Sequence, residues 1–534
     1  MHMVKAQSLL MAAALAAGAV TGCESITGLN HLSVGSASDD ATVNDAGSEA
    51  SNGGDEVTED AADDAIADDA ACINRSAWAG RGCFSCKPTE LAELRNACTT
   101  ATCTPFDNVA RIPGYSADAA ARSPKLPATS STDAGGTPPP DAGAAAAASD
   151  AGAAPSTSEA GAAPGHVLCS TLLPRPVYLY GSTALAIGLR TLAQAIAGTA
   201  TLVYQSDSSC LGLDAINTGT TRLKGSAQYW PVGQAQPALC DIENEQPADV
   251  GLCDVSPESC IEGFSGSDNL VNDIGAAQVF MFTVPNGSSQ KAISAEAAYN
   301  VFGFDDGGVL PWVDPESLMR RGPGSGNQLT IASSLGLAPA YWRGVIKAKS
   351  SEVKPALLAL SDPEKGLGIT SADVADEMDS RANLRTLAYQ HYGQSCAFTP
   401  DSTTGSSDKR NVRDGHYELW APLHFYTRGS GGHTQDPFIG EVVSFLTGAK
   451  PLPNRNTDLI TTLKQSGLIP TCAMHVTRAK EGARIVPFQP SPSCSCYYDA
   501  SPPGGVVPAD CKTCTTNAEC PDSAQNCSFG YCEP

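Results

Sequence analysis

The chain has 534 residues, a formal net charge of −24 and 20 cysteines. That length allows one large domain or several small ones. The acidic excess is uneven, because residues 24–165 carry 21 Asp and Glu against 7 Lys and Arg, whereas residues 166–500 carry 32 against 24. The charge therefore belongs mostly to a solvated N-terminal region, which argues against nucleic acid as a partner.

The first 23 residues have the form of a lipoprotein signal peptide. Lys5 precedes an apolar run from Leu9 to Val20, and the run ends in the lipobox Val20-Thr21-Gly22-Cys23. The run is short for a membrane span and is typical of a removed export signal. We expect Cys23 to become the acylated N-terminus of an exported protein held to a membrane by lipid. The alternative is a plain secretory peptide with an incidental cysteine.

Three segments of unusual composition follow the signal. Residues 24–71 predict a disordered acidic tether, since 24–70 hold 13 acidic side chains and no Lys or Arg. Residues 72–115 predict a small module in which zinc-like spacings compete with disulfides, and export favours disulfides over metal. Residues 116–165 predict an Ala/Pro/Gly/Ser linker that separates this module from the main domain. The module's cysteines are Cys72, Cys83, Cys86, Cys98 and Cys103.

A second cysteine-rich segment is expected at the C-terminus, over residues 501–534. Its fixed shape would depend on crosslinks, because it has little apolar content. Cys494 and Cys496 are candidates to join it to the main domain. Without Cys23 the chain has 19 cysteines, so at least one thiol is free, modified or paired with another chain. The segment contains Cys511, Cys514, Cys520, Cys527 and Cys532.

The main domain is predicted over residues 166–500 as an α/β fold with mostly parallel sheets, because strand and helix patterns alternate. More than 300 residues are large for one core, which favours two lobes. The expected strands cover 177–180, the start of 201–216, 247–255, 277–285, 367–370, 384–391 and 417–427. The expected helices cover 185–196, the end of 201–216, 294–303, the end of 322–336, 437–447 and 459–465.

The segment 177–196 predicts a strand, a tight turn and a helix. Ser182 or Thr183 is a natural N-cap, and Gly181 lets the backbone approach a group above the turn. The N-terminus of a helix carries free N–H groups and partial positive charge, which favour a small anion. An ordinary strand-to-helix turn without a ligand is the alternative.

Four segments in the right order resemble the PstS-like, phosphate-binding branch of the type 2 periplasmic solute-binding proteins. They are Tyr180-Gly181-Ser182-Thr183, the turn YQSDSSCLG at 204–212, the strand end ADVGLCD at 248–254, and Arg320-Arg321 followed by Gly324-Ser325-Gly326-Asn327. The resemblance covers about 300 residues. The cysteine-rich flanks separately resemble segments of secreted myxobacterial proteins.

The resemblance implies a two-lobed fold with hinge strands that closes on phosphate or a similar oxyanion, with an ABC transporter permease as partner and no cofactor. It implies a ligand-facing Asp254, for which a turn-capping role is the alternative. Asp254 would favour a ligand that still carries a proton, and so hydrogen phosphate over sulfate. The implied ligand-binding residues are Gly181, Ser182, Thr183, Ser208, Ser209, Asp254, Arg320, Arg321, Ser325, Gly326 and Asn327.

Several positions depart from the family pattern. Pro323 stands where an aspartate is usual, and Asn327 replaces a threonine. Cys210 and Cys253 occupy loop positions that are commonly Gly or Ser. If they pair with each other, or with Cys240 or Cys260, the rim of the pocket is rigid.

Two further functions compete with solute capture. One is a surface-displayed adhesion or interaction protein that keeps the scaffold without transport, which suits the long tether and the cysteine modules. The other is a hydrolase using the same cleft. His416, His424 and His433 lack a nucleophile-and-base arrangement or metal spacing, so we expect them to be structural and the protein not to be an enzyme.

Overall fold

The computed structural model describes residues 83–86, 88–116, 167–234, 236–304, 308–521 and 526–533. The predicted signal peptide with Cys23, the tether, Cys72 and nearly all of the 116–165 linker lie outside the described residues. Within the described part of the chain, no helix combines the length and apolar character needed to cross a membrane.

The first lobe is built on a sheet in which β2 pairs in parallel with both β3 and β6. Its strand order is β1-β5-β4-β3-β2-β6, and β4 and β5 form an antiparallel edge hairpin. The strands are β1 Val167–Leu168, β2 Pro176–Gly181, β3 Thr201–Ser206, β4 Leu223–Tyr229, β5 Ala238–Gln246 and β6 Val250–Cys253.

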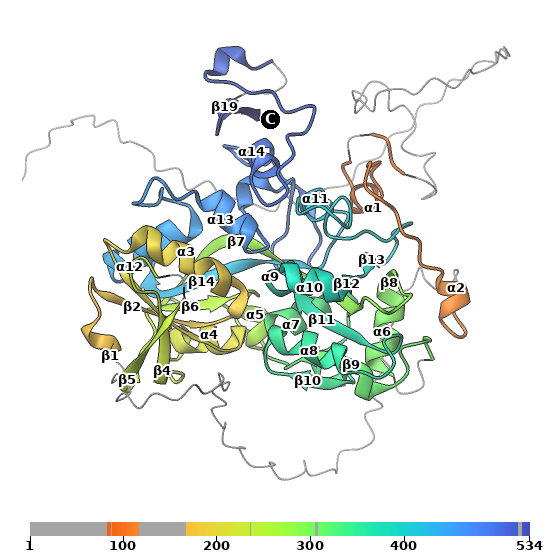
Figure 1. The fold of residues 1–534 in the computed structure, drawn as a ribbon, viewed down its shortest axis with the longest axis horizontal. Coiled ribbons are helices and arrows are strands. Elements are labelled where there is room, and N and C mark those ends of the chain that lie inside the picture. Colours follow the sequence, from red (N-terminus) through yellow and green to blue (C-terminus); the bar gives the residue numbers. More distant parts are fainter. Residues whose placement is uncertain are drawn as a thin grey trace, which may run out of the picture. The chain divides into compact units, whose positions relative to one another are not determined.

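Helices cover both faces of this sheet (Figure 1). Successive strand residues point to opposite faces, so Val177 and Leu179 pack with α3, α12 and α13, whereas Tyr178 and Tyr180 pack with α4. A sheet that is buried on both sides accounts for the continuous apolar run of β2. The helices are α3 Ala186–Ile196, α4 Ser209–Asn217, α12 Pro437–Thr447 and α13 Leu459–Gln465, with the short α5 at Pro257–Cys260.

Two long strands join the lobes. The first part of β7 (Leu270–Pro285) pairs with β14 (Trp420–Ser430), and its last part pairs with β11 (Leu367–Ser371) and β12 (Leu384–Thr386). All these pairings are antiparallel, as are those of β15 (His433–Thr434) and β16 (Leu468–Ile469). The expectation of mostly parallel sheets was therefore wrong, because connecting strands and hairpins add antiparallel pairs to the parallel centre of each lobe.

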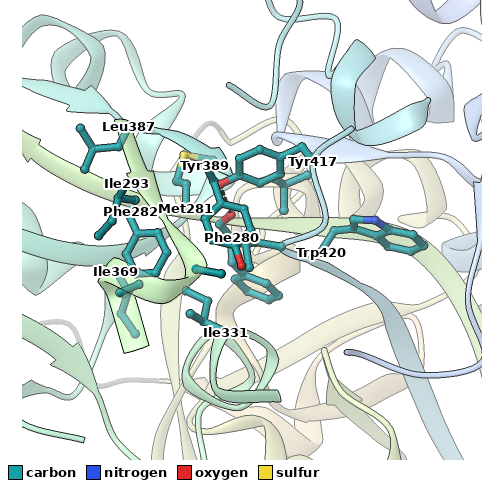
Figure 2. Packing of buried hydrophobic residues seen from close by; sticks show 14 of the residues in the cluster. Phe280, Met281, Phe282, Ile293, Ile331, Ile369, Leu387, Tyr389, Tyr417 and Trp420 are labelled. Carbon is teal, nitrogen blue, oxygen red and sulfur yellow. Dashed lines mark hydrogen bonds between the residues drawn. The ribbon is translucent and has the colours of Figure 1, made fainter. Parts of the chain in front are cut away.

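The second lobe has the strand order β7-β11-β9-β10, with β9 parallel to both of its neighbours. Figure 2 shows its core, where Phe280 and Phe282 of β7 lie among Ile331, Ile369 and aromatic side chains. Its elements are β8 Ala292–Ser294, α6 Ala295–Gly303, β9 Leu318–Arg321, α7 Gly326–Leu335, β10 Val345–Lys347, α8 Val353–Leu358, α9 Ala372–Ala375, α10 Met378–Asn383, β13 Ala388–Gln390 and α11 Arg410–Arg413.

The N-terminal cysteine module packs on the second lobe. It contains α1 (Leu91–Arg95) and α2 (Asn108–Arg111), and Cys103 forms a disulfide with Cys396. Arg95 donates to the buried Glu418, and Leu94, Phe106 and Ile112 join the core of this lobe. Although a long linker separates the module from the main domain in sequence, the two are crosslinked in space.

Eight disulfides lie among the described residues, which is typical of a protein that matures in an oxidising compartment. Cys496–Cys511 joins the C-terminal segment to α14 (Ser495–Ala500), as expected, whereas Cys494 pairs with Cys472. The segment ends in the hairpin β19 (Asn526–Ser528) and β20 (Tyr531–Glu533), and another small hairpin joins β17 (Val476–Thr477) to β18 (Val486–Pro487). The other disulfides are Cys83–Cys98, Cys103–Cys396, Cys169–Cys240, Cys210–Cys260, Cys514–Cys527 and Cys520–Cys532.

Candidate functional site

A small cavity lies where turns of both lobes meet β7, and its volume is about 10 Å³. That is the volume one water molecule needs, so the lobes are closed on each other around it. The residues that line it are Ser182, Thr183, Ala184, Asp207, Ser208, Ser209, Asp254, Phe280, Arg321, Ser325, Asn327, Ser350 and Ser371.

The first wall is the turn from β2 into α3, through the 3₁₀ turn η4 (Thr183–Leu185). The Ser182 side chain accepts a hydrogen bond from Ala184 N at 3.1 Å, so Ser182 is an N-cap. Gly181 has φ +124°, and a Cβ there would overlap Leu252 O and the Cα of Gly212. Only glycine lets β2, β6 and α4 approach this closely and still turn toward the cavity.

The second wall is the turn from β3 into α4. Asp207 N donates to Gly181 O at 2.7 Å, and Tyr180 donates its hydroxyl to Asp207 Oδ2 at 2.8 Å, so this turn is held against the first. At the start of α4, the Ser209 hydroxyl donates to Asp254 Oδ1. Asp254 directly follows β6, which places its carboxyl between the two helix starts.

The third wall belongs to the second lobe and is the start of α7. Gly326 N donates to Ser209 Oγ at 3.1 Å, and Cys210 N donates to Gly324 O at 3.3 Å, so the two lobes touch directly. A Cβ on Gly326 would overlap the Asp254 carboxyl. Asn327 is 2% exposed, and neither polar atom of its side-chain amide has a partner among the described residues.

Arg321 supplies the positive charge of the cavity. It is 5% exposed, and its guanidinium donates to Lys347 O at 3.0 Å, to Ala348 O at 2.6 Å and to Ser350 Oγ. A guanidinium has more N–H donors than these three acceptors use. The charged group is therefore fixed in position and keeps donors for another acceptor.

Burial raises the pKa values of two carboxyl groups at or near the cavity, Asp254 and Asp373. Burial raises the pKa of Asp254, and the Ser209 hydrogen bond and the charge of Arg321 partly oppose this shift. Nearby, burial raises the pKa of Asp373 from 3.8 to about 7; a Ser371 hydrogen bond opposes that shift, and the Asp254 charge adds to it. Asp373 Oδ1 also accepts from Gln278 Nε2 at 3.2 Å.

The shifted pKa of Asp373 predicts a pH-dependent stability. A carboxyl whose pKa is raised on folding contributes stability that is complete below pH 3.8 and is lost as the pH rises through 7. As the pH rises from 5.5 to 8, ionisation of Asp373 should lower the free energy of unfolding by about 2 kcal/mol. We expect Asp373→Asn to remove that difference in denaturant titrations at the two pH values, whereas Asp510→Asn, at an exposed position, should leave it. An unchanged difference in Asp373→Asn would contradict the assignment.

The structure brings together most of the residues expected from the sequence. Eight of the eleven line the cavity. Gly181 and Gly326 lie behind its wall, where they permit close approach. Arg320 lies elsewhere, since its Nε donates to Gly344 O at 3.2 Å on the outer edge of the sheet.

Sequence reasoning missed five lining residues: Ala184, Asp207, Phe280, Ser350 and Ser371. Asp207 lies inside a segment that the sequence singled out, so its position after β3 was a usable signal. Phe280, Ser350 and Ser371 reach the cavity only through tertiary packing.

The structure also locates the cysteines and histidines that the sequence singled out. Of the pairings considered for the rim, the structure has Cys210–Cys260, and Cys253 is a buried free thiol. His416 contacts Ala97 O at 2.9 Å and His424 contacts Asn272 Oδ1 at 2.9 Å. Neither they nor His433 lines the cavity.

The architecture is two-lobed and α/β, with β7 and β14 connecting the lobes. Among solved structures, the chain is similar to a candidate phosphate ABC transporter substrate-binding protein with bound phosphate from Clostridium perfringens (14% identity, 56% of this chain and 100% of that chain, TM-score 0.38). It is also similar to an ABC-type phosphate transport receptor from Vibrio cholerae (14%, 55% and 99%, 0.36) and to the reduced OxyR regulatory domain from Pseudomonas aeruginosa (10%, 52% and 98%, 0.30). No known family's sequence profile and no curated protein matches the chain.

Proposed function

We propose that this protein captures a small oxyanion between its two lobes, with phosphate as the favoured ligand. The observation that carries the proposal is the convergence of three helix starts, the fixed Arg321 guanidinium and the buried Asp254 carboxyl on one cavity. The first N–H groups of a helix have no partner within the helix and attract anions. Hydroxyls of Ser182, Ser325 and Ser371 add further donors.

Capture requires the lobes to separate, because a tetrahedral oxyanion is larger than the present cavity. Opening would break the contacts of Ser209 with Gly326 and of Cys210 with Gly324, while β7 and β14 continue to connect the lobes. Hinge closure of this kind binds without chemistry. Each hydrogen bond to the charged ligand would contribute about 1.5 to 3 kcal/mol. After the costs of association, about micromolar affinity is within reach.

Asp254 is expected to select the protonation state of the ligand. A buried carboxylate beside an anion is favourable only when the anion donates a proton to it, which hydrogen phosphate does and sulfate does not. We expect the wild-type chain to bind phosphate at least about tenfold more tightly than sulfate, and Asp254→Asn to lose this preference.

Isothermal titration calorimetry with phosphate, sulfate and molybdate tests both the function and the selectivity. Glu243→Gln is a matched control, since it removes an exposed carboxylate of the first lobe that does not line the cavity. Heat from phosphate that is reduced in Asp254→Asn but not in the control variant supports the proposal. Absence of heat from all three anions would contradict capture and leave surface display as the better explanation.

The cellular setting is part of the proposal. The lipobox at Cys23 would anchor the chain to a membrane, and the residues up to the cysteine module would tether it there. An ABC transporter permease is the partner that such a binding protein would serve. Radiolabelled palmitate incorporation that is lost in Cys23→Ser would support the anchor, and equal incorporation would contradict it.

A further inference from the structure

A second and much larger cavity, of about 420 Å³, lies in the second lobe. Small-molecule sites typically have volumes of about 300 to 1,000 Å³. Its walls include Met281 and Thr283 of β7, Leu384 and Thr386 of β12, Pro400 and Thr104. Thr104 belongs to the N-terminal cysteine module and follows Cys103, so the module completes this cavity.

The second cavity is distinct from the small cavity between the lobes, which we call the oxyanion site. Side chains of neighbouring strand residues point to opposite faces. Phe280 of β7 lines the oxyanion cavity, whereas Met281 and Thr283 line the second one. No residue lines both cavities.

Two carboxylates in the wall, Asp376 and Asp401, form ion pairs with cations of the protein itself. Asp376 pairs with Arg381 at 2.9 Å and with the buried Lys409 at 2.7 Å. Asp401 pairs with Lys409 at 2.9 Å. These carboxylates therefore already have cationic partners and do not need one from a ligand.

Two other cations in the wall have no such partner. Among the described residues, neither Arg385 nor Lys291 has a carboxylate oxygen within 4.0 Å, and both line the cavity. Lys291 is exposed. With Arg381 included, three cations and two carboxylates line the cavity, and Lys409 behind the wall pairs with both carboxylates. The cavity is therefore positive in a chain whose net charge is −24. Charge of one sign inside a concave wall attracts ions of the opposite sign.

Backbone carbonyls fix the position of the Arg385 guanidinium at the cavity. Its Nη1 donates to Ser288 O at 2.6 Å and to Gln290 O at 3.1 Å, and its Nη2 donates to Asn286 O at 3.4 Å. These carbonyls fix the guanidinium plane without neutralising its charge. A fixed guanidinium pairs well with a planar carboxylate.

The apolar part of the wall points to an organic ligand. Met281, Ala375, Leu384 and Pro400 provide a surface that an inorganic anion would not use. We propose that this cavity binds a small organic carboxylate, with its carboxylate at Arg385 and Lys291 and its apolar body against Met281 and Leu384. Threonine hydroxyls around the wall would orient polar substituents. The proposal does not depend on the function of the oxyanion site.

The test uses three probes of the same shape and different charge: benzoate, benzamide and benzylamine. Calorimetry or saturation-transfer NMR on the intact exported chain should show millimolar or tighter binding of benzoate and at least about tenfold weaker binding of the other two. Arg385→Gln should weaken benzoate about tenfold or more. Thr104→Trp, which fills the cavity from the module side, should abolish binding without altering the core of the lobe.

Lys224→Gln is the matched control, because it removes an exposed cation from the first lobe. Benzoate affinity should be unchanged in Lys224→Gln. Because no residue lines both cavities, failure of the oxyanion site would not affect the result. No benzoate binding at millimolar concentration, equal binding of benzamide, preference for benzylamine, or an Arg385→Gln affinity equal to wild type would each overturn the proposal.

Discussion

Replacement of Arg321 by alanine is expected to abolish oxyanion capture and to destabilise the second lobe. Arg321 is the cation that lines the small cavity, and the anion would lose at least two charge-assisted hydrogen bonds. At about 1.5 to 3 kcal/mol each, the loss corresponds to at least about a 100-fold weaker affinity for phosphate. Calorimetry with phosphate measures it directly.

The same substitution should also lower the unfolding free energy. Without the guanidinium, Lys347 O, Ala348 O and Ser350 Oγ lose the donor they now share. An acceptor left unsatisfied in a buried place costs about 1 to 3 kcal/mol, so a total loss of about 3 kcal/mol is expected in denaturant titrations. Water that enters the enlarged cavity would reduce this loss.

Arg320 provides the matched control, because it is the preceding residue of the same strand and points away from the cavity. Arg320→Ala should leave phosphate affinity within about twofold of wild type. Equal losses in the two variants would show that general damage to β9, and not the removal of a ligand-binding charge, weakens binding.

Gly181→Ala is expected to be among the most destabilising single substitutions in the first lobe. Its φ of +124° is strained for any residue with a side chain, and the added Cβ would overlap Leu252 O and Gly212 Cα. Backbone strain costs about 1 to 3 kcal/mol and overpacking a similar amount. We expect a loss of at least about 3 kcal/mol in the unfolding free energy from denaturant titrations.

Gly198→Ala is the control for that experiment. It lies just beyond α3, and a Cβ there would have no neighbour within 4 Å. Its stability should stay within about 0.5 kcal/mol of wild type or rise slightly. A Gly181→Ala variant as stable as Gly198→Ala would show that α4 and β6 move apart at low cost.

Local patterns in the sequence were sufficient to place the elements that carry the first cavity. The apolar run of β2, the Ser182 cap and the heptad-like leucines of α3 are all local signals, and helices α12 and α13 have the bounds that were expected. Ser182, Ser209 and Asp254 could be predicted because each follows the end of a buried strand. Of the two arginines, only Arg321 lines the cavity, because strand alternation sends two adjacent residues to opposite faces.

Long-range features could not be read from the sequence. Nothing local indicates that Cys103 pairs with Cys396 across 293 positions, or that Cys472 rather than the C-terminal segment takes Cys494. The antiparallel join of β7 with β14 depends on a strand that continues from one lobe into the other. The second cavity was missed for the same reason, because its wall is assembled from segments almost 300 residues apart.

The Cys103–Cys396 bond turns everything between these residues into a closed covalent ring. A protease that cuts the backbone once anywhere between the two cysteines opens the ring but releases neither fragment. Under non-reducing electrophoresis the nicked chain would migrate as one species, and only a thiol reductant would separate its pieces. If Cys23 carries the proposed lipid, the two lobes would then stay at the membrane after a single cleavage between Cys103 and Cys396.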